Sequence, residues 1–194
     1  MSFTKEDILI KKLIQIIIIV FIFTIIISVF TENAKSFLIK LIYKIGYSEY
    51  VEEFAEKYNV EKELIYAIIK VESNFDENAV SKSNAKGLMQ IMTATAQEIA
   101  DKYGINLTEE NITDPKINIE IGTIYISQLL EKYNNKQVAL AAYNAGQGNV
   151  NKWITQETIK SDGSDIENIP FPETNMYVRK VMRDYNIYKD QIFA

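Results

Sequence analysis

The 194-residue chain contains no cysteine and no histidine. These two absences exclude thiolate nucleophiles, catalytic triads that depend on histidine, zinc sites built from cysteine or histidine, and disulfide bonds. A lipid-modified N-terminal cysteine is excluded as well, so any membrane anchor must be a hydrophobic segment. The groups that remain for catalysis are carboxylates, hydroxyls, amides and tyrosine.

Basic residues are too few for a nucleic-acid-binding protein. Lys and Arg number 21 against 26 Asp and Glu, which gives a formal net charge of −5. The basic footprint that neutralises phosphates is therefore absent, and we expect no nucleic-acid partner. Apolar residues make up 47% of the chain and charged residues 24%. This composition allows one compact domain with a sizeable core and a short appendage.

A strongly apolar run occupies residues 13–30, which read LIQIIIIVFIFTIIISVF. Its length reaches the lower limit of what spans a hydrocarbon core of about 30 Å. The run has no amphipathic period, which argues against the alternative of a buried globular helix. A cleaved signal peptide is the stronger alternative, but no small-x-small cleavage site follows Phe30, where the sequence continues TENAK. We therefore predict an uncleaved transmembrane signal anchor.

The segments around this run complete a four-part organisation. Lysines flank the run on both sides, so the count of basic residues does not orient it. Residues 33–46 are mostly apolar with a polar stripe at Ser36, Lys40 and Lys44, which predicts a membrane-proximal helix. The predicted parts are a short cytoplasmic tail (1–12), the transmembrane anchor (13–30), a membrane-proximal helical linker (31–48) and a folded domain (49–194).

The folded domain has the pattern of an all-α protein. Residues 64–71 form a nearly all-apolar helix, which predicts that this helix is central and buried. Asp114 followed by Pro115 is an N-cap signal for a helix that runs to about Tyr133. The predicted class is all-α, with five to eight helices after the anchor. No period-2 alternation indicates a strand, and further helices are expected over 93–103, 136–145 and 174–189.

Glu72 is the most informative anomaly in the sequence. It lies in LIYAIIKVESNF (64–75), four residues after Ile68 and seven after Ile65, which places its carboxyl on the apolar stripe. It also stands at the helix C-terminus, the negative end of the helix dipole. Both effects disfavour the ionised form and predict a raised pKa, as a general acid for glycoside cleavage requires. Taken alone, the segment also fits a partly exposed glutamate at a frayed helix end.

Two further segments hold side chains suited to a binding site. GLMQIM at 87–92 follows a polar loop, and its Gln90 can hold sugar hydroxyl or amide groups. AAYNAGQGNV at 141–150 places Tyr143 before Asn144, and a tyrosine hydroxyl is a good hydrogen-bond partner for a buried carboxyl. Alone, the first segment also fits a loop with core residues, and the second a helix C-cap.

Together these segments resemble the catalytic domain of the soluble lytic transglycosylases, a lysozyme-like bacterial family related to goose-type lysozyme. Five motifs occur in the family's order and at about its spacing, and the ordered set is far more specific than any one of them. The resemblance implies a membrane-anchored, single-domain form of the family. The motifs are VESNF (71–75), GLMQIM (87–92), INIEIGTIYISQLL (117–130), AAYNAGQGNV (141–150) and IPFPETNMYVRKV (169–181).

The resemblance implies roles for individual positions. Glu72 is implied to be the single catalytic acid, and Tyr143 the residue whose hydroxyl orients its carboxylate. Where the family commonly has proline this chain has Thr93, which we expect to cap the following helix instead. No metal and no cofactor is implied. The other positions implied to contact the saccharide or shape the groove are Ser81, Gln90, Met92, Tyr125, Asn144 and Glu173.

The implied substrate is peptidoglycan, cleaved at the β-1,4 bond between N-acetylmuramic acid and N-acetylglucosamine. Glycoside hydrolysis usually needs two carboxylates. With one, the muramoyl C6 hydroxyl is implied to be the nucleophile, which gives a 1,6-anhydro product. One alternative is a hydrolytic muramidase on the same fold, with Asp76, Glu77 or Asp114 available to position water. A second is a non-enzymatic wall-binding protein that has kept the groove.

This function places the domain outside the cytoplasm. The expected location is the cell membrane, single-pass, with residues 31–194 extracellular. The expected partners are peptidoglycan glycan strands and, through the N-terminal helix, the membrane. The sequence identifies no protein partner and no physiological process for the enzyme.

Overall fold

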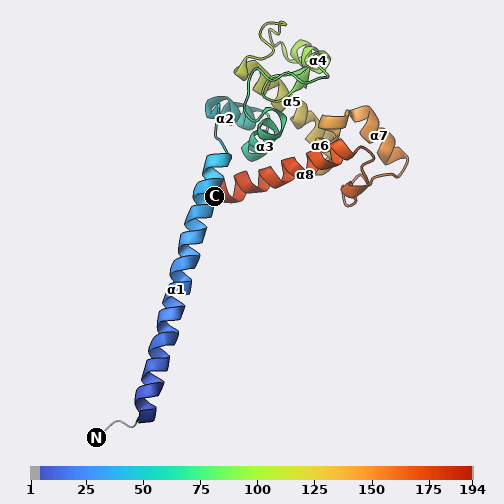
Figure 1. The fold of residues 1–194 in the computed structure, drawn as a ribbon. Helices are drawn as coiled ribbons and strands as arrows, with labels where there is room; N and C mark the ends of the chain where they lie inside the picture. Colours follow the sequence, from blue (N-terminus) through green and yellow to red (C-terminus); the bar gives the residue numbers. More distant parts are fainter. Residues whose placement is uncertain (1–4, 194) are drawn as a thin grey trace. The chain divides into compact units, whose positions relative to one another are not determined.

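A computed structural model describes residues 5–193 (Figure 1), and the chain divides into two compact units, with the boundary in the sequence between Ile42 and Tyr43. The first unit is a single helix, α1 (Lys5–Ile42). Residues 1–4 of the predicted cytoplasmic tail lie outside the described residues. Residues 5–12 already belong to α1, which continues without a break through the predicted anchor into the predicted linker.

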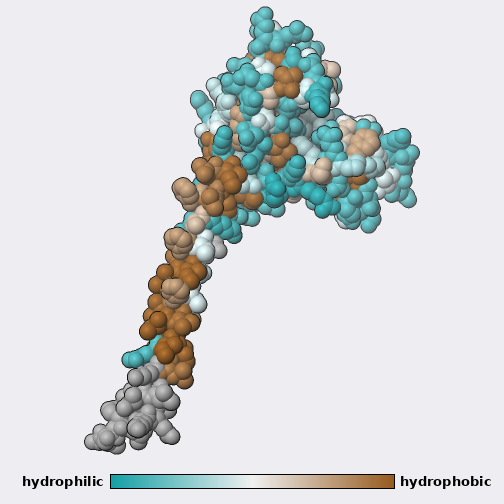
Figure 2. All heavy atoms as spheres, in the orientation of Figure 1, coloured by the Kyte–Doolittle hydropathy of each residue, from teal (hydrophilic) through white to brown (hydrophobic). Residues whose placement is uncertain are grey.

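Helix α1 carries many large apolar side chains, and most of those described are exposed, among them Phe21, Phe30 and Leu41. Figure 2 shows apolar side chains along the face of α1 in view. Its Gln15–Ile42 segment is long and apolar enough to cross a membrane, by a criterion that a signal sequence near the N-terminus also meets. This result confirms the expected N-terminal apolar helix as a candidate membrane span. A helix of 38 residues is about 57 Å long at the usual rise.

The second unit is built almost entirely of helices, which confirms the predicted all-α class. Helices are found at the expected positions over 93–103, 115–133 and 136–145. The small antiparallel pair and helix α7 are among the elements that were not expected. The elements are α2 (Ser48–Lys57), α3 (Lys62–Ser73), β1 (Ala85–Lys86), β2 (Ile91–Met92), α4 (Thr93–Tyr103), α5 (Pro115–Tyr133), α6 (Lys136–Ala145), α7 (Gln147–Thr155), the 3-10 turn η1 (Ile166–Asn168), α8 (Pro172–Ile187) and the π-helical turn η2 (Tyr188–Ile192).

The core lies where α3, α6 and α8 meet. Helix α3 packs against α8, and α6 packs against both α8 and α5 (Figure 1). Every residue from Leu64 to Ile69 is buried, which confirms the expected central helix. Burial of each large aliphatic side chain contributes about 1.5–3 kcal/mol, so α3 is a firm support for the residues at its C-terminal end.

The two expected helix caps have opposite outcomes. Asp114 caps α5 as expected, because its Oδ1 accepts a hydrogen bond of 3.1 Å from the backbone N–H of Ile117. The expectation that Thr93 caps α4 is wrong. The helix begins at Thr93 itself, so Met92 occupies the cap position, and the buried Thr93 hydroxyl has no partner among the described residues. A capping side chain must stand one residue before the first turn to reach its free N–H groups.

Residues 43–47 pack onto the helical unit. The buried Tyr43 donates a hydrogen bond of 2.9 Å from its hydroxyl to Asp184 near the end of α8. The Tyr188 hydroxyl donates to the carbonyl of Lys44 at 2.9 Å. The Tyr47 hydroxyl donates to Glu77 in the loop after α3. The compact unit therefore begins at Tyr43, before the boundary at 49 expected from sequence.

Candidate active site

Glu72 is the last residue but one of α3, at the edge of the core. The residue is half-buried, and burial of its carboxyl raises the pKa to about 7. Hydrogen bonding from Tyr177 acts in the opposite direction, and the negative charge of Glu173 raises the pKa further. The predicted rise in pKa is confirmed. A carboxyl with this pKa can hold a proton at neutral pH and can also release it.

Tyr177 is the neighbour of Glu72 that the sequence did not reveal. It lies in α8, which packs against α3, and 6% of it is exposed. Its hydroxyl is buried and forms no hydrogen bond of ordinary geometry within the described residues, yet it is close enough to Glu72 to lower the carboxyl's pKa as a donor. One sequence signal points toward Tyr177. It follows Glu173 by four residues, one helical turn, so the two side chains share a face of the helix.

Tyr143 contacts the loop between β1 and β2 rather than the acid. The residue is buried, and its hydroxyl donates a hydrogen bond of 2.8 Å to the carbonyl oxygen of Met89. Burial raises its pKa well above 10, and the nearby charge of Glu72 adds to this rise. The Tyr143 ring also packs at 5.1 Å from the ring of Tyr125. Tyr143 therefore holds Met89 and lies near the carboxyl of Glu72.

The GLMQIM loop is fastened to α5 by one buried amide. Asn118 accepts a hydrogen bond from the N–H of Met89 at 2.8 Å and donates to the carbonyls of Lys86 at 3.0 Å and Ile112 at 2.9 Å. Gly87 has a positive φ of 79°, and a Cβ there would stand 2.3 Å from the Asn118 side chain. Only glycine therefore allows the loop to approach Asn118 this closely.

The loop is also tied to α3 beside Glu72. The Ser73 hydroxyl lies 2.9 Å from the carbonyl oxygen of Leu88, to which it can donate, and it accepts from the N–H of Phe75 at 3.2 Å. Asn74 and Phe75 both have left-handed backbone, with φ of 51° and 68°. The chain therefore turns sharply away from α3 directly after the acid, which leaves the acid at the end of the helix.

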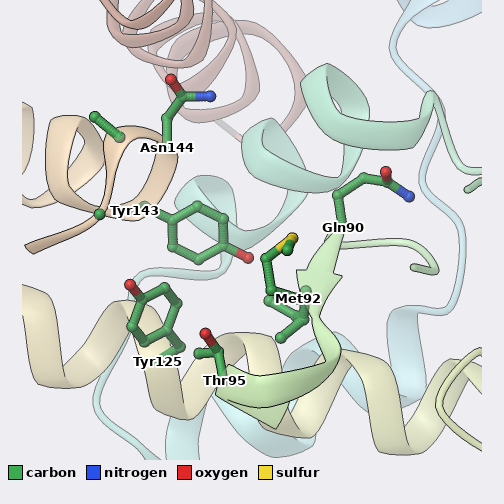
Figure 3. A pocket seen from close by; sticks show the side chains of 9 residues that line it. Gln90, Met92, Thr95, Tyr125, Tyr143 and Asn144 are labelled. Carbon is green, nitrogen blue, oxygen red and sulfur yellow. The ribbon is translucent and has the colours of Figure 1, made fainter. Parts of the chain in front are cut away.

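A groove runs past these residues in three adjoining pockets. The first holds Tyr125, Tyr143 and Asn144 (Figure 3). Asn144 also lines the second pocket, which contains Glu72. A third pocket continues the first past Tyr125. Seven of the eight predicted site residues line the groove. The first pocket also includes Gln90, Met92 and Thr95, the second includes Glu173, Met176, Tyr177 and Lys180, and the third includes Glu98, Lys102, Gln128 and Gln147.

Two of the predicted binding residues, Gln90 and Ser81, use their polar groups in hydrogen bonds to the backbone of the loop region. Gln90 donates from Nε2 to the carbonyls of Ala79 and Gly87, both at 2.9 Å, and its side chain points away from Tyr143 (Figure 3). The Ser81 hydroxyl accepts from the N–H of Ala85 at 3.0 Å, and Ser81 is not among the residues that line the three pockets. Both residues shape the loop that borders the groove.

The acids named for water activation lie elsewhere. Asp76 accepts a hydrogen bond from the N–H of Asn78, Glu77 accepts from Tyr47, and Asp114 caps α5. Glu173, in the first turn of α8, is the second carboxyl in the pocket of Glu72. Across the residues that the structure describes, no group of three acidic side chains is arranged to hold a metal ion.

Comparison with known proteins gives a consistent result. Residues 49–166 match the family model described as "Transglycosylase SLT domain". The chain is 31% identical over 150 residues to the soluble lytic murein transglycosylase of Escherichia coli, which covers 75% of this chain and 23% of that protein. It is 33% identical over 129 residues to the membrane-bound lytic murein transglycosylase C of Serratia proteamaculans, covering 60% of this chain and 36% of that protein.

A solved structure shares the same fold. It is an inactive glutamate-to-glutamine mutant of the lytic transglycosylase Slt from Pseudomonas aeruginosa. The TM-score is 0.70 at 33% sequence identity, and the match covers 78% of this chain and 25% of the other. The chain thus spans only a quarter to about a third of the length of these proteins.

Proposed function

Since the chain belongs to the transglycosylase SLT domain family, we propose that it is a peptidoglycan lytic transglycosylase. It cleaves the β-1,4 bond between N-acetylmuramic acid and N-acetylglucosamine without consuming water and leaves a 1,6-anhydromuramoyl end. The observation that carries this proposal is the buried carboxyl of Glu72, with a pKa of about 7, facing a groove at the end of a rigid helix.

Glu72 acts twice in the proposed reaction. Its protonated carboxyl donates to the glycosidic oxygen as the bond from that oxygen to muramoyl C1 breaks, and the muramoyl N-acetyl group stabilises the positive charge at C1. The resulting carboxylate then removes the proton of the muramoyl C6 hydroxyl while that oxygen bonds to C1. The acid is thereby regenerated. A pKa between those of a strong acid and a strong base suits a group that must perform both steps.

The neighbours of Glu72 tune and position it. The charge of Glu173 favours the protonated form of Glu72, and the Tyr177 hydroxyl stabilises the carboxylate formed after the first step. Tyr143 keeps the loop at Met89 in place beside the acid. Tyr125, Met92 and Asn144 form the surface on which the saccharide lies. The fixed groups around the acid thus support each of its two protonation states in turn.

A hydrolytic muramidase is the second candidate, because Glu173 lines the same pocket as Glu72. An exposed carboxylate at this position is a possible base for an attacking water. The two reactions differ in product, since hydrolysis leaves a reducing muramic acid end. We favour the transglycosylase because Glu72 has a pKa suited to both steps without a second catalytic group.

We also propose that the protein is held in the cell membrane by α1 with the helical unit outside. The support is the apolar Gln15–Ile42 segment, together with a substrate that lies outside the cytoplasm. One of the similar proteins is itself described as membrane-bound.

The test is digestion of purified peptidoglycan by the full chain in detergent and by its Glu72→Gln variant. The wild type should release soluble fragments. Glu72→Gln should lower the rate by ~10²–10⁴-fold or more, because loss of one positioned acid–base group has that effect and this group serves both steps. Near-normal release by the variant would overturn the assignment of Glu72. No release by either protein, with tight binding to the wall, would favour a non-enzymatic role.

A further inference from the structure

A buried hydroxyl controls the amide of Asn144, the residue shared by the first two pockets. Thr174 lies in the first turn of α8 and is 2% exposed. Its Oγ1 donates a hydrogen bond of 2.8 Å to Oδ1 of Asn144, which lies near the C-terminus of α6. The bond therefore joins the two helices at the point where the groove passes Glu72.

This bond fixes which end of the Asn144 amide faces the groove. The amide nitrogen, Nδ2, makes no hydrogen bond within the described chain, and Asn144 is exposed. Asn144 lines both the first pocket and the pocket of Glu72, so its amide stands where the two pockets adjoin. In Figure 3 the Asn144 side chain and Tyr125 lie on opposite sides of the Tyr143 ring. With its oxygen held by Thr174, the amide presents a donor to the groove.

The opposite orientation of the amide is disfavoured by the threonine itself. If the amide turned by 180°, Nδ2 could donate to Thr174 Oγ1, but the hydrogen of this buried hydroxyl would lose the one acceptor that it has among the described residues. A buried donor without an acceptor is destabilising. Thr174 therefore selects one of two nearly isosteric arrangements of Asn144, and these differ in whether the groove offers a donor or an acceptor.

We propose that Thr174 is a positioning residue that holds the Asn144 amide with its N–H groups toward the groove, where they donate to an oxygen of the N-acetylated saccharide beside Glu72. This inference rests on the proposed function. Hydroxyl, ring and acetamido oxygens of such a saccharide all accept hydrogen bonds, and a correctly placed donor next to the acid holds the sugar for proton transfer. Thr174 does not touch the saccharide and acts only through Asn144.

The experiment is a double-mutant cycle on the full chain in detergent, with variants Thr174→Val, Asn144→Ala and the pair. Thr174→Val should lower kcat/KM for peptidoglycan cleavage roughly tenfold, as loss of one hydrogen bond of typical strength does. Thr174→Ser, which keeps the hydroxyl, should restore most of the loss. In the Asn144→Ala background, Thr174→Val should have no further effect. The matched control is Thr123→Val, which removes a buried hydroxyl that has no partner among the described residues.

A second measurement separates this inference from the proposed reaction. The affinity for a chitin oligomer, an N-acetylated saccharide, should fall in Thr174→Val and in Asn144→Ala. The double variant should lose no more affinity than Asn144→Ala alone. This pattern would support the positioning role even if the wild type cleaved no peptidoglycan, which would overturn the proposed function alone. Wild-type affinity and kcat/KM in Thr174→Val would overturn the inference. So would losses that multiply in the double variant, since Thr174 would then act by another route.

Discussion

The Tyr143 hydroxyl lies 2.8 Å from the carbonyl oxygen of Met89 and donates its hydrogen to it. This bond joins α6 to the loop that borders the groove. Asn118 holds the N–H of the same residue at 2.8 Å, so both polar groups of the Met89 backbone are fixed by buried side chains. The wall of the first pocket that Gln90, Ile91 and Met92 form is thereby built from a loop with little freedom to move.

Tyr143→Phe should loosen this wall without removing the acid. The carbonyl of Met89 would be left buried and unpaired, which typically lowers the free energy of unfolding by about 1–3 kcal/mol. Peptidoglycan cleavage should fall, but less than in Glu72→Gln. Tyr133→Phe is the control, because the Tyr133 hydroxyl donates to Asn151 on the exposed surface. Equal and small changes in unfolding free energy for both variants would contradict the role assigned to the Met89 bond.

The pKa of Glu72 makes a prediction about stability. A carboxyl whose pKa rises to about 7 in the folded state opposes folding once the unfolded chain ionises. This opposition is absent below about pH 4, grows as the pH rises toward 7, and is complete above it. Glu72→Gln should therefore gain stability relative to the wild type over this interval, by about 3 kcal/mol at pH 8. Denaturant unfolding of both proteins in detergent at pH 4 and pH 8 measures the difference. A gap that does not change with pH would show that the carboxyl is not buried as described.

Glu173 and Tyr177 should shift the pH dependence of activity in opposite directions. Cleavage requires protonated Glu72, so the rate should fall as the pH rises through its pKa. Glu173→Gln removes a charge that raises this pKa and should move the alkaline limb of kcat/KM to lower pH. Tyr177→Phe removes a donor that lowers the pKa and should move the limb to higher pH. Glu167→Gln, an exposed acid in η1, is the matched control. Shifts of the same sign would contradict the electrostatic account.

The topology makes a separate prediction. Protease added to intact protoplasts should degrade the helical unit, because residues 31–194 are proposed to lie outside. The mature chain should retain its original N-terminus, because the apolar segment is proposed to be an uncleaved anchor. Protection of the helical unit from the protease, or an N-terminus that maps near residue 34, would contradict the anchor.

Features set by local periodicity could be predicted from the sequence. The apolar stripe of α3 placed Glu72 at the edge of the core, and the Asp114–Pro115 pair located the start of α5. The pairing of β1 with β2 was missed because two residues are too few to show an alternation. Helix α7 was missed because its first residues, Gln147 and Gly148, read as a turn.

Features set by contacts between distant segments could not be predicted in this way. Tyr177 reaches Glu72 only because α8 packs on α3. The spacing of α8 shows that Tyr177 shares a face with Glu173, but it does not show that this face packs against Glu72. Gln90 has left-handed backbone, with a φ of 49°, which turns its side chain back into the loop. The family motif identified Gln90 as a groove residue, but it carried no information about this orientation.

The most direct test of the proposed reaction is mass analysis of the fragments that the full chain releases from purified peptidoglycan, before and after borohydride reduction. A single acid–base group with an internal nucleophile predicts muropeptides lighter by one water than those of a hydrolase, with muramic ends that borohydride leaves unchanged. Fragments that carry reducible muramic acid ends as the main product would contradict the account. They would place the protein among the muramidases, with Glu173 as the first residue to examine for activation of water.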